Sequence, residues 1–193
     1  MDFAPIVRKH FKFLEDSYGF SLANEDKWEI EYETSKVYVN VNIAWNRGRN
    51  INVWFRLKND HPIYAGTGID LNDVLHYKEV LPVGTFLPTA ARDEKVAESI
   101  TIELADLVLK HGHEVLIGDH DFYQSLRMLI SEKAIQYSKE KELSFLKQKV
   151  KKSWREKDYA NVYYLLNSIR ESLKPSEVKK MNYAFKQMGS AKE

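Results

Sequence analysis

The chain has no cysteine among its 193 residues. Without thiols it has no disulfide scaffold, no thiolate zinc site and no cysteine nucleophile. It also lacks a run of about 18 apolar residues, so no segment is predicted to span a membrane. The first residues, Met1–Pro5, do not have the basic and apolar regions of a secretory signal peptide, which favours a cytoplasmic protein.

Sequence motifs for phosphate binding and hydrolysis are absent as well. Gly66-Thr67-Gly68 follows a candidate strand, but it lacks the fuller glycine pattern, opening onto a helix, that phosphate-binding loops use. There is no Gly-x-Ser-x-Gly and no His-Glu-x-x-His. We therefore assign no catalytic residue and no cofactor, and an enzyme of unrecognised type around residues 111–121 stays an alternative.

That segment carries the best candidate metal ligands. His111, His113 and His120 occur with Asp119 and Asp121, and imidazole and carboxylate groups bind zinc and other divalent ions. Their spacing matches no metal-binding motif. A histidine near a helix C-terminus is favoured by the helix dipole, and an aspartate before a helix is a common N-cap. We therefore predict no metal site here.

The chain has little net charge, only +1, but its charged residues are unevenly distributed. Residues 1–120 contain 13 Lys and Arg against 19 Asp and Glu, a net −6, whereas residues 121–193 contain 16 against 9, a net +7. This division suggests an α+β domain at 1–120 and a basic helical subdomain at 121–193. The basic part could lie against the acidic part, or it could bind an acidic partner or nucleic acid.

Residues 28–58 give the clearest structural signal. Apolar and polar residues alternate along three short runs, 28–34, 37–45 and 51–57, which is typical of strands with one buried face. The connections are too short for parallel crossovers, so the pattern predicts a three-stranded antiparallel meander. A fourth strand is expected at 61–66, at an edge because of Pro62. The buried face is predicted to carry Val39, Val41, Val53 and Phe55.

Helical periodicity surrounds this meander. A helix is predicted at 2–17, with Asp2 as its cap and Gly19 as its stop. Others are predicted at 71–78, with Asp70 as its cap, and at 91–111. Residues 113–121 are predicted to be irregular. Residues 122–188 are predicted to form three or four helices, with a candidate hinge in the lysine-rich stretch 138–152 and Pro175 in the first turn of the last helix. The fold class is therefore α+β, with an N-terminal helix, a three- to four-stranded meander and a mostly helical C-terminal half.

The hairpin tip between the second and third runs is the candidate partner-binding patch. Arg47 and Arg49 lie in its loop, and Trp54 lies close by. Tyr38 and Trp54 are both on the face predicted to point outward. Arginine and tryptophan are enriched in protein interfaces, and exposed aromatic rings can also stack single-stranded nucleic acid. The alternative is that the 91–111 helix covers this face and Trp54 belongs to the core.

Three stretches together resemble a group of known proteins. They are residues 10–20, His-Phe-Lys-Phe-Leu-Glu-Asp-Ser-Tyr-Gly-Phe; residues 37–41, Val-Tyr-Val-Asn-Val; and residues 154–160, Trp-Arg-Glu-Lys-Asp-Tyr-Ala, with the helical hairpin that follows. They resemble small bacterial α+β proteins, some of which are similar to immunity proteins found near polymorphic toxins. The resemblance covers the first 60 and the last 40 residues. It implies a cytoplasmic protein that binds another protein without catalysis, and it transfers no functional residue.

Two functions follow as hypotheses beside the enzyme alternative. The first is a non-catalytic interaction module, immunity-like, that occludes a partner protein's working surface. The second is a nucleic-acid-associated protein that uses the basic helical tail. The tail's lysines alternate with glutamates and few aromatic residues, so any nucleic-acid binding is expected to be weak. The sequence indicates no oligomeric state.

Overall fold

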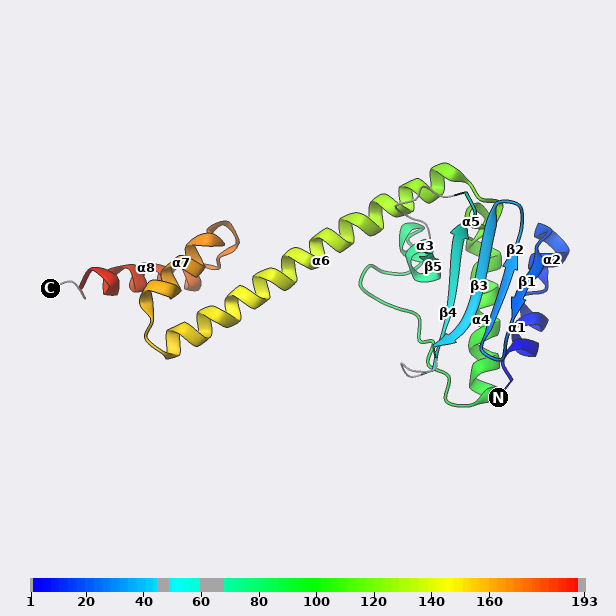
Figure 1. Ribbon diagram of the computed structural model, residues 1–193, viewed down its shortest axis with the longest axis horizontal. Coiled ribbons are helices and arrows are strands. Elements are labelled where there is room, and N and C mark those ends of the chain that lie inside the picture. The colour runs from blue at the N-terminus through cyan, green and yellow to red at the C-terminus, as the bar shows by residue number, and fades with distance from the viewer. Residues whose placement is uncertain (1, 45–48, 60–67, 191–193) are drawn as a thin grey trace. The chain divides into compact units, whose positions relative to one another are not determined.

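The computed structural model describes residues 2–44, 49–59 and 68–190, with side chains up to Met188 (Figure 1). The chain divides into two compact units, residues 1–130 and residues 131–193. The first is an antiparallel sheet with helices and the second is helical, which confirms the α+β class. Among the described helices, none is both long and apolar enough to cross a membrane.

Two short helices, not one, begin the first unit. Helix α1 spans Ala4–His10 and α2 spans Phe13–Tyr18, with a break at Phe11 and Lys12. The break allows Phe11 and Leu14 both to lie in the core. Asp2 is not the cap, because the N-cap of α1 is Phe3, which makes no side-chain bond to the helix. Gly19 ends α2 in the left-handed conformation, as its position predicted.

The sheet has five strands in the order β1-β2-β3-β4-β5, each antiparallel to its neighbour. The strands are β1 (Ser21–Glu25), β2 (Glu29–Glu33), β3 (Val37–Ala44), β4 (Asn50–Leu57) and β5 (Ile69–Asp70). The predicted meander corresponds to β2, β3 and β4, and the prediction missed two strands. β1 is exposed at every position and so shows no alternation, and β5 has only two residues. The strand expected at 61–66 lies outside the described residues.

The two faces of the sheet differ as the alternation predicted. Val39, Val41, Val53 and Phe55 are all buried, and they join the helices in one hydrophobic core. The opposite face carries the half-buried polar residues of the same strands. In Figure 1 the sheet lies in front of α4, so this polar face is turned away from that helix.

Three further helices complete the first unit. Helix α3 spans Leu71–Tyr77 and is capped by Asp70, whose carboxylate accepts the Asn72 N–H at 2.7 Å. Helix α4 spans Glu94–His111, three residues shorter than predicted, because Asp93 caps it. The segment predicted to be irregular contains a short helix, α5 (His113–Ile117), which Gly118 ends with a positive φ. Val115 and Leu116 of this helix are buried in the core, which explains why the segment is helical and not irregular.

Over residues 120–190 the chain forms three α-helices, within the predicted three or four, and the first of them is longer than the sequence pattern indicated. Helix α6 runs without interruption over His120–Arg155, so the predicted hinge at 138–152 is helical. Helices α7 (Tyr159–Ser168) and α8 (Pro175–Ser190) follow, joined by the 3-10 turn η3 (Arg170–Ser172). Val150 of α6 packs with residues of α7 and α8 in a second, smaller core. Pro175 occupies the first turn of α8, as predicted.

Candidate functional site

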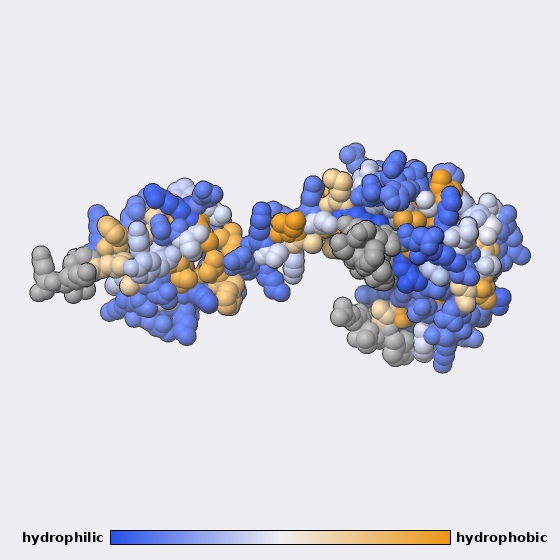
Figure 2. Space-filling view, turned by 45° about the horizontal axis from the view of Figure 1, so that its top comes forward, coloured by the Kyte–Doolittle hydropathy of each residue, from blue (hydrophilic) through white to orange (hydrophobic). Residues whose placement is uncertain are grey.

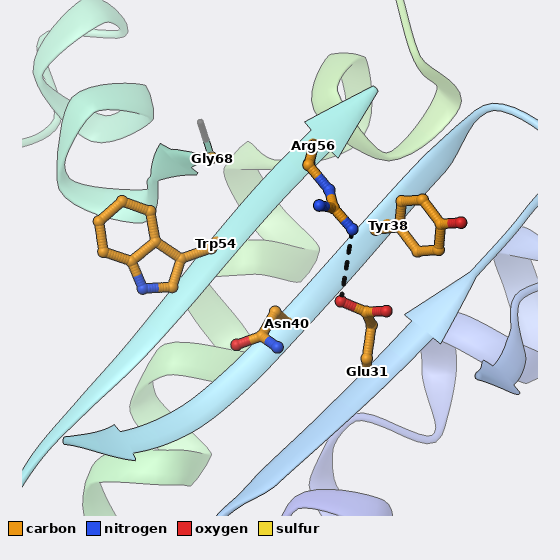
Figure 3. A pocket seen from close by; sticks show the side chains of 6 residues that line it. All are labelled: Glu31, Tyr38, Asn40, Trp54, Arg56 and Gly68. Carbon is orange, nitrogen blue, oxygen red and sulfur yellow. Dashed lines mark ion pairs between the residues drawn. The ribbon is translucent and has the colours of Figure 1, made fainter. Parts of the chain in front are cut away.

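The polar face of the sheet holds an open pocket of about 330 Å³, lined by residues from three strands and by Gly68 just before β5. The strand register brings them together. Glu31 of β2 lies opposite Asn40 of β3, which lies opposite Trp54 of β4. One row further along, Tyr38 lies opposite Arg56. Figure 3 shows these side chains on one face, with Trp54 at one side and Tyr38 at the other.

Arg56 lies across this pocket and connects its charged and aromatic members. Its guanidinium lies 4.5 Å from the centre of the Tyr38 ring, within cation–π range. Its Nη2 is 3.8 Å from a Glu31 carboxylate oxygen, at the long end for an ion pair. The Arg56 side chain keeps 37% of its surface exposed. A planar guanidinium held over a ring, with donors still facing water, is well placed to bind a partner's carboxylate.

A second cationic group lies near the same tyrosine. Lys58 lies 4.7 Å from the centre of the Tyr38 ring, and its ammonium is 2.5 Å from the Glu33 carboxylate. The hydrogen bond to Glu33 raises the pKa of Lys58. Two cations, each near a glutamate, therefore lie within cation–π range of this one tyrosine.

An asparagine ladder continues the polar face toward the other end of the strands. Asn40 donates to the Glu29 carboxylate at 2.7 Å, Asn42 donates to the Asn40 carbonyl oxygen at 2.6 Å, and Asn52 donates to that of Asn42 at 3.2 Å. Each amide is thus oriented by its neighbour. A linked row of this kind makes the surface beside the pocket rigid, which lowers the entropy lost when a partner binds.

The predicted partner-binding residues are only partly brought together. Trp54 lines the pocket, half-buried, and its ring lies over Gly68, where a Cβ atom would be 3.2 Å from the indole. Arg49 is exposed just before β4, with a φ of 59°, and donates to the Arg92 carbonyl at 3.2 Å. Arg49 and Trp54 are five positions apart along the strand, roughly 17 Å. Arg47 lies outside the described residues.

The alternative placement of Trp54 in the core, under the 91–111 helix, does not match the structure. Helix α4 packs on the opposite face, where Val53 and Phe55 point. Tyr38 lines the pocket with Trp54, on the face predicted to point outward, and the residues that sequence reasoning missed are Arg56 and Glu31. The signal that would have found them is the strand register, because pairing the 37–44 and 50–57 runs end to end puts Tyr38 beside Arg56.

The histidines of the 111–121 segment lie on three different helices. His111 ends α4, His113 begins α5 and His120 begins α6. The His113 ring packs 6.0 Å from that of Tyr18. Asp119 accepts the Phe122 N–H at 3.0 Å, which is the capping role expected for it. Within the described ranges, no group of three His, Asp or Glu side chains is arranged to hold a metal ion.

The loop between α3 and α4 presents a separate apolar feature. Val83 and Phe86 are 78% and 75% exposed. The loop is nevertheless held in place, because Leu87 donates its N–H to Asn72 at 3.0 Å and the His76 ring lies 2.9 Å from the Thr85 carbonyl. The loop thus presents two exposed apolar side chains on an ordered backbone.

Comparison of the chain with protein-family models, with curated proteins and with solved structures finds no match in any of the three.

Proposed function

We propose that this chain is a non-catalytic protein-binding module, and that the polar face of its sheet is the surface that meets the partner. The observation that supports this most directly is the pocket itself. Arg56, Tyr38 and Trp54 are of the residue types that dominate binding energy in protein interfaces, and they lie together on one face. Nothing in this set combines a nucleophile with a base, so the arrangement favours binding over chemistry.

The mechanism we propose is occlusion, as in immunity proteins. A five-stranded sheet is a rigid platform, and its polar face presents a guanidinium, two aromatic rings and an ordered row of amides. A partner with a carboxylate for Arg56 and an apolar group for Trp54 would be covered by this platform. The partner's own working surface would then be closed to its substrate. The protein would be active in the cytoplasm, without a cofactor.

The experiment begins with affinity capture from cells that express the chain naturally, followed by purification of the captured protein. Its affinity for the parent is then compared with that for Arg56→Ala and Trp54→Ala by calorimetry. Each variant is expected to weaken binding by about 2 kcal/mol, roughly thirtyfold, because each removes a central contact. The parent is also expected to inhibit the captured protein, and the variants to inhibit it less.

Arg92→Ala is the matched control, since Arg92 has an exposed side chain outside the pocket. The control is expected to bind like the parent. Urea unfolding must show that Trp54→Ala stays folded, with a loss of only about 1 kcal/mol for a half-buried residue. The affinity of Arg49→Ala is measured in the same way, and a loss of affinity would mean that the interface extends to the hairpin end of β4. Parental affinity in both pocket variants would contradict the proposal.

A further inference from the structure

The C-terminal unit has a groove between α6 and α8 that is rich in lysine. Its volume is about 520 Å³. Lys147 and Lys151 lie one turn apart on α6, and Lys174 and Lys180 face them from the start and the middle of α8. Leu143 and Val150 form its apolar part. We call this set of six residues the lysine groove.

The lysines of the groove are not equivalent. Lys147 is 3.0 Å from the Glu177 carboxylate, which also accepts the Lys174 backbone N–H at 2.8 Å. These contacts lower the pKa of Glu177. The hydrogen bond from the Lys174 backbone is the largest cause, and the hydrogen bond from Lys147 is the next one that lowers the pKa. Lys151 and Lys174 make no side-chain ion pair among the described residues. The groove therefore keeps uncompensated positive charge beside an apolar wall.

We propose that the lysine groove binds an acidic amphipathic helix of a partner protein. Its apolar residues would pack on Leu143, and its carboxylates would meet Lys151 and Lys174. Charge complementarity is the argument for an acidic occupant, because residues 131–193 carry 15 Lys and Arg against 8 Asp and Glu. A groove with an apolar part and a charged rim suits a helix that anchors through one face.

Nucleic acid fits this groove less well. Base stacking needs an open aromatic face, and none of the described residues that line the groove is aromatic. The ring that Lys180 contacts, Trp154, is only partly exposed. The Lys180 ammonium lies 4.8 Å from its centre, and the rings of Tyr159 and Tyr183 lie 5.7 and 5.5 Å away. Glu140 and Glu177 also line the groove and would repel a continuous row of phosphates.

The acidic residues of the first unit are poor candidates for the occupant, because many already have partners within that unit. Several pair with cations, and others accept backbone N–H groups at turns and helix starts. The paired glutamates are Glu25, Glu33, Glu98 and Glu114, and the aspartates that accept N–H groups are Asp26, Asp70, Asp93 and Asp119.

The test uses the full chain and a fluorescent peptide of Ala, Leu and Glu, about 14 residues or four helical turns long, with all leucines on one face. Binding is followed by anisotropy at ~0.15 M salt. Lys151→Glu/Lys174→Glu is expected to weaken binding about tenfold or more, because it reverses both free charges. Lys141→Glu/Lys179→Glu is the matched control, with the same charge change at exposed positions outside the groove, and is expected to weaken it by less than about threefold.

A peptide of the same composition with its leucines scattered is expected to bind at least about tenfold more weakly, since it cannot pack on Leu143. The proposal is overturned if the parent does not bind the amphipathic peptide, if both lysine variants lose affinity equally, or if the scattered peptide binds as well. It is also overturned if oligo-dT of the same length binds more tightly through the same lysines. This surface is separate from the sheet pocket, so neither proposal depends on the other.

Discussion

Val41 lies at the centre of β3 with its side chain fully buried between the sheet and the helices. Val41→Asp is expected to lower the free energy of unfolding by several kcal/mol, because it places an unpaired carboxylate in the core. Urea unfolding followed by circular dichroism measures the loss. Leu22→Asp is the control, because Leu22 is also an apolar strand residue but is exposed on β1, and it is expected to cost less than about 1 kcal/mol. Equal losses would contradict the assignment of the faces.

Tyr32 is an unusual member of the same core. Its side chain is fully buried, and its hydroxyl has no hydrogen-bond partner among the described residues. An unpaired buried hydroxyl is costly, so Tyr32→Phe is expected to leave stability unchanged or raise it by up to about 1 kcal/mol at neutral pH. Unfolding curves of the two proteins measure this. A loss of more than about 1 kcal/mol would mean that the hydroxyl does have a partner.

The same residue predicts a pH dependence. Burial, followed by the nearby Glu15 charge, raises the pKa of Tyr32 from 10.0 to about 12. The unfolded chain therefore loses this proton at lower pH than the folded chain, so stability is fully present below pH 10 and falls as the pH rises toward 12. Across this pH range, the ionisation of Tyr32 is expected to lower the free energy of unfolding by on the order of 2–3 kcal/mol. Burial likewise raises the pKa of Tyr123.

Tyr32→Phe removes this contribution and leaves that of Tyr123 in place. Its stability relative to the parent is therefore expected to grow between pH 10 and pH 12, which unfolding measured at a series of pH values will show. A difference that stays constant over this range would refute the role of the buried phenol.

At the scale of elements, α6 is notable because its burial varies strongly along its length. Tyr123 and Leu126 are buried in the core of the first unit, and Val150 and Ser153 are buried in the second unit. Residues 134–142 between them are exposed at every position. Contacts along one helix face still support this stretch, for example Gln136 donating to Glu140 at 2.8 Å.

We therefore expect amide hydrogen exchange in 134–142 to be faster than in the two ends of the same helix, because an exposed helix opens locally without disturbing either core. Exchange measured by mass spectrometry on peptides from α6 tests this. The buried ends serve as the internal reference. Equal protection along the whole helix would show that another surface covers its middle.

At the scale of the whole molecule, charge is the property with the clearest consequence. The first unit carries a net −6, from 14 basic and 20 acidic residues, and the second a net +7, from 15 and 8. Opposite charges of nearly equal size compensate each other, which limits attraction to a polyanion. Nucleic-acid binding by the full chain is therefore expected to be weak and to fall steeply with salt.

Titration of labelled RNA and DNA at near-physiological salt measures this. Neutralising Lys147, Lys149, Lys151 and Lys152 to Gln is the comparison variant, and it is expected to change little. Tight binding by the parent that disappears in this variant would favour the nucleic-acid function over the protein-binding one.

The sequence by itself determined the α+β class and the faces of the central strands. Alternation at Val39, Val41, Val53 and Phe55 reports which side is buried, because a strand turns successive side chains to opposite faces. The sequence also predicted the helix ends at Asp70 and Gly19, because both roles are local. An aspartate before a helix accepts a nearby backbone N–H, and a glycine after a helix adopts the left-handed conformation that ends it.

The tertiary structure decided what depends on residues far apart in the chain. β1 is a strand because it pairs with β2, although its exposed sequence has no strand pattern. The stretch at 138–152, a candidate hinge within the predicted helices, continues α6 without a break, and its C-terminal end packs on α7 and α8. Likewise, Trp54 and Tyr38 were identified from sequence as outward-facing, but Arg56 and Glu31, which line the same pocket, were not assigned to a site. Those contacts are set by the strand register, and no single run of residues encodes it.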